Sequence, residues 1–427
     1  MTSVFHPPIG DRTWRNRSLV PSPPGPASPG HDLPARSAGS VPAVAQPVPR
    51  ARLHARLSAV WEAMADQSVD CLVVSGRGLI SQYGYLEYLI GFCPVVRLGY
   101  AVILPNREPV VVMSTRSDAY FARETSGFEV RVAGQGDVIS DKDSMPGVIE
   151  EILLEQHVTP RHLGVVGLGH IVASADADAL RQMFPDARVT DATRLLNDIK
   201  TLKTREEYAD VRAAGEVADA GLQAFMHHAD AGIGGWELYG EMERAVRRLG
   251  AREVLVFIGT GPYFLHRPHV DPLLDGDLVT VYLESTGPNG YWVERAGLFT
   301  VGQVGDRKRE YAETCLRAHR AAQDAIVVGN TASDVAAALE AETAPLGALP
   351  GIWHGHGVGV DHDTPVITTG DSTPIREGMV IAIHPNLTDP EETVGASVAD
   401  TYIVTPSGAE AISRIPQSLR PIGRSTR

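Results

Sequence analysis

The stretch that decides the fold is Leu278–Val301, LVTVYLESTGPNGYWVERAGLFTV. Its first part, Leu278–Leu283, is apolar and rich in β-branched residues, and its last part, Tyr291–Val301, is again aromatic and aliphatic. The tripeptide Pro288-Asn289-Gly290 between them has the turn chemistry that joins two strands. The pattern therefore predicts a hairpin in the core of the protein.

Two positions in this hairpin need an explanation. Glu294 places a carboxylate inside an apolar strand, which is unfavourable unless the group is paired or used. Leu283 is notable for the opposite reason, because no second carboxylate stands there. Glu294 is thus the first candidate for a functional residue.

Length and composition limit the classes of function. A chain of 427 residues is expected to form more than one domain, and a hydrophobic fraction of 43% can build sizeable cores. The net charge of −14 would repel nucleic acid and anionic membranes, and no apolar run approaches the roughly 20 residues that span a bilayer. Three scattered cysteines favour a reducing cytoplasm. A small-molecule substrate is the expected partner.

The chain divides into three parts. Residues 1–49 hold eleven of the thirty prolines and are expected to be a disordered tail. Residues 50–197 alternate short apolar strands with helical patterns, which predicts an α/β domain. Residues 198–427 begin with a long amphipathic helix, for which Thr204 and Glu207 form a capping-box signature, and continue as an α+β domain with a mainly antiparallel sheet.

Histidines of the second domain gather near predicted strand ends. His266 lies in GTGPYFLHRPH, His356 and His362 lie in HGHGVGVDHD, and His384 ends the apolar run GMVIAIHP. Imidazole can give and take protons near neutral pH, and a neighbouring carboxylate raises its pKa. Splitting a C–N bond requires both a proton donor and a base, so these residues together with Glu294 could carry such a reaction.

These motifs resemble those of the pita-bread family, which includes creatinase, prolidase, aminopeptidase P and methionine aminopeptidase. GTGP before His266, GYWVER, GHGVG, GMVIAIHP and DTYIVTPSG occur in the family's order and spacing, and the resemblance covers roughly residues 50–415. It implies a pita-bread (creatinase/aminopeptidase) fold for residues 198–427 and a creatinase-type α/β fold for the domain before it.

The resemblance also shows departures from the family's metal site. Its metallopeptidases hold two ions with two Asp, one His and two Glu, and this chain matches those positions with Leu283, Glu294, His356, His384 and Ala399. A pair of divalent ions needs bridging carboxylates, so we predict that the binuclear site is absent and that no cofactor is required.

Creatinase is the family member that also works without metal. The resemblance to it implies that His266 is a general acid/base and that Glu294 binds substrate, and it suggests that Arg97 reaches the substrate of a partner subunit in a homodimer. We assign His266, Glu294 and His384 to catalysis, and His356, Arg97 and His362 to substrate binding.

The resulting prediction is a metal-independent, creatinase-like hydrolase of a C–N bond in a small non-peptide molecule. Three alternatives stay open. The first is a hydrolase resembling Xaa-Pro peptidases that keeps a single metal ion, for which Glu294, His356 and His384 offer a ligand set. The others are a lyase, isomerase or cyclase that uses the same proton-transfer residues, and a binding protein without catalytic activity.

Overall fold

The computed structural model describes residues 47–77, 84–95, 98–133, 145–268 and 271–423. The predicted Pro-rich tail lies almost wholly outside these ranges, as does Arg97. No helix among the described residues is both long and apolar enough to cross a bilayer.

The N-terminal domain is built on a mixed sheet of six strands in the order β4-β3-β2-β1-β5-β6. Strands β3 and β4 pair in parallel, as do β1 with β5 and β5 with β6, whereas β2 runs antiparallel to both of its neighbours. Its elements are α1 (Arg50–Asp66), β1 (Cys71–Arg77), α2 (Gly84–Ile90), β2 (Leu98–Ile103), β3 (Val110–Met113), α3 (Arg116–Ser126), β4 (Glu129–Val132), α4 (Met145–Glu155), β5 (His162–Val166), α5 (Ser174–Met183), β6 (Arg188–Asp191) and α6 (Thr193–Lys200).

Both faces of this sheet are covered by helices. Successive side chains of a strand point to opposite faces, and in β1 Leu72 and Val74 belong to the same core cluster as residues of α1 and α2. Cys71 and Val73 belong to a second cluster, which contains residues of α4 and α5. The domain is thus the α/β layer structure that the sequence predicted.

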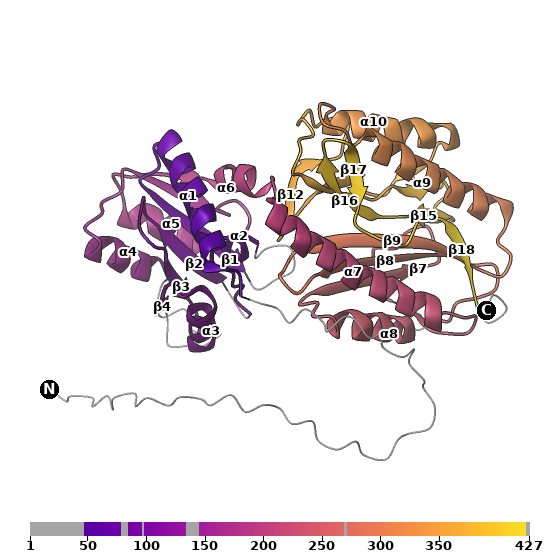
Figure 1. Cartoon of the computed structure of the whole chain (residues 1–427), viewed down its shortest axis with the longest axis horizontal. Helices are drawn as coiled ribbons and strands as arrows, with labels where there is room; N and C mark the ends of the chain where they lie inside the picture. Colours follow the sequence, from indigo (N-terminus) through magenta and orange to yellow (C-terminus); the bar gives the residue numbers. More distant parts are fainter. Residues whose placement is uncertain (1–46, 78–83, 96–97, 134–144, 269–270, 424–427) are drawn as a thin grey trace, which may run out of the picture. The chain divides into compact units, whose positions relative to one another are not determined.

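The C-terminal domain joins two helical pairs to mainly antiparallel sheets, in which only β18 pairs in parallel with β9 among the described strands (Figure 1). Its described strands have the orders β18-β9-β8-β7, β12-β11-β13-β16-β17 and β10-β14-β15. The elements are α7 (Arg205–His228), α8 (Gly235–Arg247), β7 (Val254–Gly259), β8 (Leu278–Thr286), β9 (Trp292–Val301), α9 (Asp306–Ala325), α10 (Ala332–Thr343), η1 (Ala344–Leu346), β10 (Leu349–Pro350), β11 (Gly355–Val358), β12 (His362–Val366), β13 (Val380–Ile383), β14 (Asn386–Thr388), β15 (Gly395–Ser397), β16 (Asp400–Thr405), β17 (Gly408–Ala411) and β18 (Leu419–Ile422).

Helix α7 lies across the hairpin β8–β9 and begins with the predicted capping box. Thr204 accepts a hydrogen bond from the backbone N–H of Glu207 at 3.3 Å, and the Glu207 carboxylate accepts one from the backbone N–H of Thr204 at 2.7 Å. Gly221 allows the helix to approach the sheet closely, because a Cβ there would lie 2.6 Å from the Leu283 side chain. Leu283 therefore points toward α7, on the face of the hairpin that the helix covers.

Buried ion pairs connect the two domains. The Arg56 guanidinium of α1 lies 2.7 Å from the Glu207 carboxylate and donates to the Tyr291 hydroxyl at 2.9 Å. Asp363 of β12 pairs with Lys200, at the end of α6, and with Lys203, whose Nζ lies 2.5 Å from a carboxylate oxygen. These contacts are almost inaccessible to solvent, so each partner depends on the other to offset its desolvation.

Candidate functional site

The register of the hairpin β8–β9 determines which side chains share a face. Glu284 lies directly opposite Glu294, and Leu283 lies opposite Arg295. Opposed residues of an antiparallel pair point to the same face, so Glu284 and Glu294 face away from α7 together. Leu283 occupies the position of a metal-binding Asp in the family resemblance, yet it points to the other side.

Strand β9 brings Glu294 beside the second sheet. The backbone N–H of Glu294 donates to the Thr401 hydroxyl at 3.0 Å, and the backbone N–H of Ala296 donates to the carbonyl of Ala399 at 3.0 Å. His356 comes from the middle of β11, and His384 follows the end of β13. Three segments distant in the sequence thereby place their side chains at one point.

Glu294, His356 and His384 form a buried cluster that could hold a metal ion. One Glu294 oxygen lies 2.8 Å from Nε2 of His356, and the other lies 3.8 Å from Nε2 of His384. One candidate ligand atom from each side chain lies within 4.8 Å of those of the other two. The Tyr282 hydroxyl donates a hydrogen bond to the Glu294 carboxylate and so restricts its orientation.

The charges within the metal-free cluster favour one ion pair. Burial raises the pKa of Glu294, but the two imidazoles lower it by a larger amount. The net pKa of Glu294 therefore lies well below its usual range. For His356, burial lowers the pKa and the Glu294 carboxylate raises it, with a net value of about 9. Burial lowers the pKa of His384 to about 4. Near neutral pH the cluster therefore contains a carboxylate, an imidazolium and a neutral imidazole.

A metal ion fits this donor set. Nδ1 of His356 lies 2.8 Å from the carbonyl oxygen of Gly357, the kind of contact that fixes the orientation of a ligating imidazole and leaves Nε2 toward the centre of the cluster. Nδ1 of His384 is buried without a hydrogen-bond partner among the described residues. Two imidazoles and one carboxylate form a typical ligand set for catalytic zinc, in which a fourth position is open.

Ala399, at the position of the last Glu ligand in the family resemblance, packs with Ala296, Tyr282 and Phe264 in a small apolar cluster. This side of the site therefore supplies no oxygen ligand for a divalent cation. Among the described residues, Glu294, His356 and His384 are the set whose candidate ligand atoms lie within 4.8 Å of one another.

The other predicted site residues lie outside the cluster. The exposed His362 has its ring 4.2 Å from that of His356, centroid to centroid, and so lies at the edge of the cluster. His266 lies in the loop after β7, where its Nδ1 is 2.8 Å from the carbonyl oxygen of Arg267. It lines a different pocket, of about 410 Å³, with Thr260 and Asp271. Arg97 lies outside the described residues.

Two residues of the site escaped the sequence analysis. Tyr282 and Glu284 lie on β8, on the same face as Glu294, and burial together with the charge of Glu294 raises the pKa of Glu284 to about 8. The turn Gly287–Gly290 is the feature of the sequence that could have revealed Glu284. The backbone N–H of Gly287 donates to the carbonyl of Tyr291 at 2.8 Å, and this contact sets the register of the two strands. Counting back from that turn would have placed Glu284 opposite Glu294.

Comparisons with known proteins agree with this architecture. The dipeptidase PepE from Mycobacterium ulcerans has a similar solved structure, with a TM-score of 0.74 and 24% identity, over 88% of this chain and 99% of that one. The C-terminal domain has the pita-bread fold, which confirms the predicted fold class. Residues 209–406 match the model of metallopeptidase family M24.

Several proteins of similar sequence are named as dipeptidases. The chain is 28% identical to the Xaa-Pro dipeptidase of Pyrococcus furiosus over 233 residues, which are 53% of this chain and 66% of that protein. It is 26% identical to the probable dipeptidase PepE of Mycobacterium tuberculosis over 351 residues, which are 80% of this chain and 91% of that protein.

These relatives correct the function predicted from the sequence. The prediction of a creatinase-like, metal-independent hydrolase that acts on a non-peptide C–N bond is wrong, because the matching proteins include Xaa-Pro dipeptidases and the matching family model is one of metallopeptidases. The creatinase-like roles of His266 and Glu294 followed from residues around two motifs only. The predicted enzyme class, a hydrolase, is supported. Among the alternatives, the relatives favour the hydrolase that resembles Xaa-Pro peptidases and keeps a single metal ion.

Proposed function

We propose that the chain hydrolyses Xaa-Pro dipeptides with one divalent metal ion, held by Glu294, His356 and His384. The observation that carries this proposal is the buried convergence of two imidazoles and one carboxylate, with candidate ligand atoms within 4.8 Å of one another. The similarity to Xaa-Pro dipeptidases supplies the substrate class.

The residues around the cluster have complementary tasks. A divalent ion at this place supplies Lewis acidity to a peptide carbonyl and activates water. Tyr282 orients Glu294 through its hydroxyl, and the carbonyl of Gly357 orients His356. Glu284 lies on the same face of the hairpin as Glu294, and its burial favours the protonated form of its carboxyl group. We assign it the transfer of a proton to the leaving prolyl nitrogen as water adds to the carbonyl carbon and the C–N bond breaks.

Metal content and turnover of the purified protein test this proposal together. We expect about one divalent ion per chain and hydrolysis of Ala-Pro. A chelator should remove the ion and abolish hydrolysis, and adding the ion back should restore hydrolysis. Glu294→Gln should lower metal affinity by about 100-fold or more, since even residues that only orient a ligand contribute 10–100-fold.

A matched control is Glu340→Gln, because Glu340 pairs with His354 at 3.1 Å and does not belong to the cluster. This variant should keep its metal and its turnover. Two ions per chain, or full turnover after complete removal of metal, would contradict the proposal.

The resemblance that predicted a homodimer supplies the only support for that state, and we retain it as a proposal. A molar mass of two chains by light scattering is the expected result, and a mass of one chain would refute it.

A further inference from the structure

The joint between strands β9 and β16 lies beside the metal-binding cluster. Strand β9 carries Glu294, whereas His356 lies on β11 and His384 follows β13, in the sheet that also contains β16. The distance between the carboxylate and the two imidazoles therefore depends on how these two sheets are joined.

Strand β9 contacts its neighbours on this side through the backbone N–H groups of alternate residues. Those of Trp292 and Ala296 donate to backbone carbonyls at 2.7 and 3.0 Å. Between them, the N–H of Glu294 donates to the hydroxyl of Thr401 at 3.0 Å. Of these three contacts, only the one at Glu294 depends on a side chain.

The Thr401 hydroxyl serves both backbone polar groups of Glu294. It accepts from the N–H at 3.0 Å and donates to the carbonyl oxygen at 3.2 Å. Glu294 and Thr401 are almost fully buried, with exposed fractions of 4% and 1%. A buried N–H and a buried carbonyl without partners are unfavourable. The hydroxyl therefore favours one position of β9 at the residue that carries the carboxylate.

The register of the second sheet places Thr401 in the same row as His356. Ala382 of β13 lies opposite both Thr401 of β16 and His356 of β11. Opposed residues of antiparallel strands point to the same face, and neighbouring strands lie about 4.8 Å apart. Thr401 thus fixes Glu294 against a row of three residues that ends at the imidazole with which Glu294 pairs.

Gln417 contacts the same joint from the C-terminal segment of the chain. Its side-chain nitrogen lies 2.9 Å from the carbonyl oxygen of Ala296 on β9 and 2.9 Å from that of Ala399, the residue before β16. It also lies 2.9 Å from the Asp400 carboxylate. Gln417 follows residues 209–406, the part of the chain that matches the family model.

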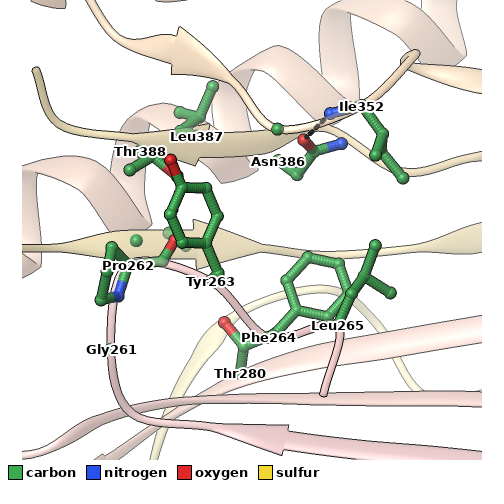
Figure 2. A pocket seen from close by; sticks show the side chains of 13 residues that line it. Gly261, Pro262, Tyr263, Phe264, Leu265, Thr280, Ile352, Asn386, Leu387 and Thr388 are labelled. Atoms are coloured by element: carbon green, nitrogen blue, oxygen red, sulfur yellow. Dashed lines mark hydrogen bonds between the residues drawn. The ribbon is translucent and has the colours of Figure 1, made fainter. Parts of the chain in front are cut away.

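The backbone of His384 is held by contacts that do not involve β9. Asn386 donates to the carbonyl of His384 at 2.9 Å and accepts from the backbone N–H of Ile352 at 2.7 Å. Figure 2 shows Asn386 and Ile352 at the rim of a pocket of about 40 Å³, opposite Phe264. Glu294 is therefore the ligand whose position depends on the joint.

We propose that Thr401 is a positioning residue of the metal site and that Gln417 assists it. Together they fix the Glu294 carboxylate at the distance from the two imidazoles that a single divalent ion requires. The inference rests on the metal site of the proposed function and is independent of the substrate. Residues that orient metal ligands contribute about 10–100-fold to metal affinity.

Zinc binding by three variants tests the role of Thr401. Thr401→Val removes the hydroxyl and keeps the shape of the side chain, so it should lower zinc affinity by at least about tenfold in calorimetry. Thr401→Ser keeps the hydroxyl and should stay within about threefold of the parent protein. Thr286→Val is the matched control, since the equally buried Thr286 hydroxyl accepts two backbone N–H groups, each at 3.0 Å, at the turn end of β8.

Cobalt in place of zinc gives a spectroscopic measure of the site. The visible absorption of bound cobalt depends on the number and arrangement of its ligands. We expect this absorption to change in Thr401→Val and to match that of the parent protein in Thr401→Ser and Thr286→Val. A loss of folding stability alone would leave the absorption of the bound ion unchanged.

Gln417→Leu is a second test, which decides the question if Thr401→Val does not fold. Leucine lacks the amide, so zinc affinity should fall by about threefold or more. Gln323→Leu is its control, because Gln323 is also half-buried and contacts the Tyr402 hydroxyl at 3.3 Å instead of the joint. Zinc affinity equal to that of the parent in folded Thr401→Val or in Gln417→Leu would overturn the proposal, as would an equal loss in Thr286→Val.

Failure of this inference can be distinguished from failure of the proposed function. If the parent protein binds no divalent ion, the proposed function is wrong. If the parent binds one zinc ion per chain and Thr401→Val binds zinc equally well, the metal site is supported and the positioning role of Thr401 is wrong.

Discussion

Tyr282 connects the apolar and the polar parts of the site. The ring of Tyr282 stacks on Phe264, and its hydroxyl donates a hydrogen bond to the Glu294 carboxylate. A side chain fixed at both ends can hold the carboxylate in one orientation, which is the usual role of a residue behind a metal ligand.

We expect Tyr282→Phe to lower metal affinity by about 10–100-fold while the protein remains folded. Isothermal titration with zinc measures the effect. Tyr402→Phe is the control, since this buried hydroxyl contacts His319 and Gln323 instead of the cluster. Equal zinc affinities for Tyr282→Phe and the parent protein would show that the hydroxyl does not orient Glu294.

A second buried histidine predicts how stability depends on pH. Burial, and then the positive charges of Arg295 and Arg320, lower the pKa of His319 to about 3. The unfolded chain binds a proton at this residue below pH about 6.5, whereas the folded protein does not until about pH 3. Stability therefore falls as the pH decreases through this window, and His319 accounts for about 2 kcal/mol of the fall between pH 7 and pH 5.

His319→Gln should remove that part of the acid sensitivity. Urea unfolding at pH 7 and pH 5 measures it, as the difference between the two free energies of unfolding in the parent and in the variant. If that difference is the same in both proteins, His319 is not held neutral in the folded state.

Sequence analysis at the residue scale singled out the three residues of the cluster and assigned them to catalysis and substrate binding, whereas we propose that they hold a metal ion. Glu294 was identified because a carboxylate in an apolar strand requires a partner, and that reasoning needs no coordinates. The convergence of His356 and His384 on Glu294 depends on how β11 and β13 pack beside β9, which local sequence does not encode. His266, chosen for its motif, lies in another pocket.

At the scale of elements, strand alternation explains why a leucine at a ligand position is harmless. Leu283 and Glu284 are neighbours in the sequence but point to opposite faces of β8, one toward α7 and the other toward the cluster. The carboxylate missing from position 283 therefore has a counterpart one residue later.

Leu283→Asp should not restore a second metal ion. The new carboxylate would lie against Gly221 and the apolar face of α7, opposite Arg295, so the variant should lose about 3 kcal/mol of unfolding free energy through the cavity that the leucine leaves and the desolvation of the carboxylate. Metal analysis combined with thermal unfolding provides the check. A stable variant with two bound ions per chain would show that the hairpin has a different register.

The hairpin itself could be predicted because its signals are local. Apolar β-branched runs flank a Gly-Pro-Asn-Gly turn, and the strands form at Leu278–Thr286 and Trp292–Val301 as the pattern requires. Gly290 adopts a positive φ of 81°, which favours glycine at that position. The capping box of α7 was predictable for the same reason.

At the scale of the whole molecule, the connection between the domains depends on buried charges. Asp363 is the shared carboxylate of Lys200 and Lys203, and all three side chains are almost fully buried. Removing the negative charge would leave two ammonium groups without a counterion in the interior.

Asp363→Asn should therefore lower the free energy of unfolding by about 3–5 kcal/mol, as measured in urea. Asp198→Asn is the matched control, because Asp198 forms an exposed pair with Arg194 at 3.6 Å and should change stability by less than about 1 kcal/mol. Similar losses in the two variants would mean that Asp363 does not carry the connection.

The overall fold was predictable from five motifs in a fixed order, since each marks a turn or strand end that the architecture needs. The chemistry was not, because the loss of two ligands can accompany either metal-free catalysis or a smaller metal site. The structure brings Glu294, His356 and His384 together, and the similarity to Xaa-Pro dipeptidases favours the smaller metal site, which we propose.

Asn386 has a consequence for the order of events at the site. Its amide donates to the backbone carbonyl of His384 while its oxygen holds Ile352 at the pocket rim. A metal ion bound to His384 and a ligand that contacts Ile352 would therefore act on the same short segment of the chain. If the ion changes the affinity for such a ligand, the ligand must change the affinity for the ion by the same factor.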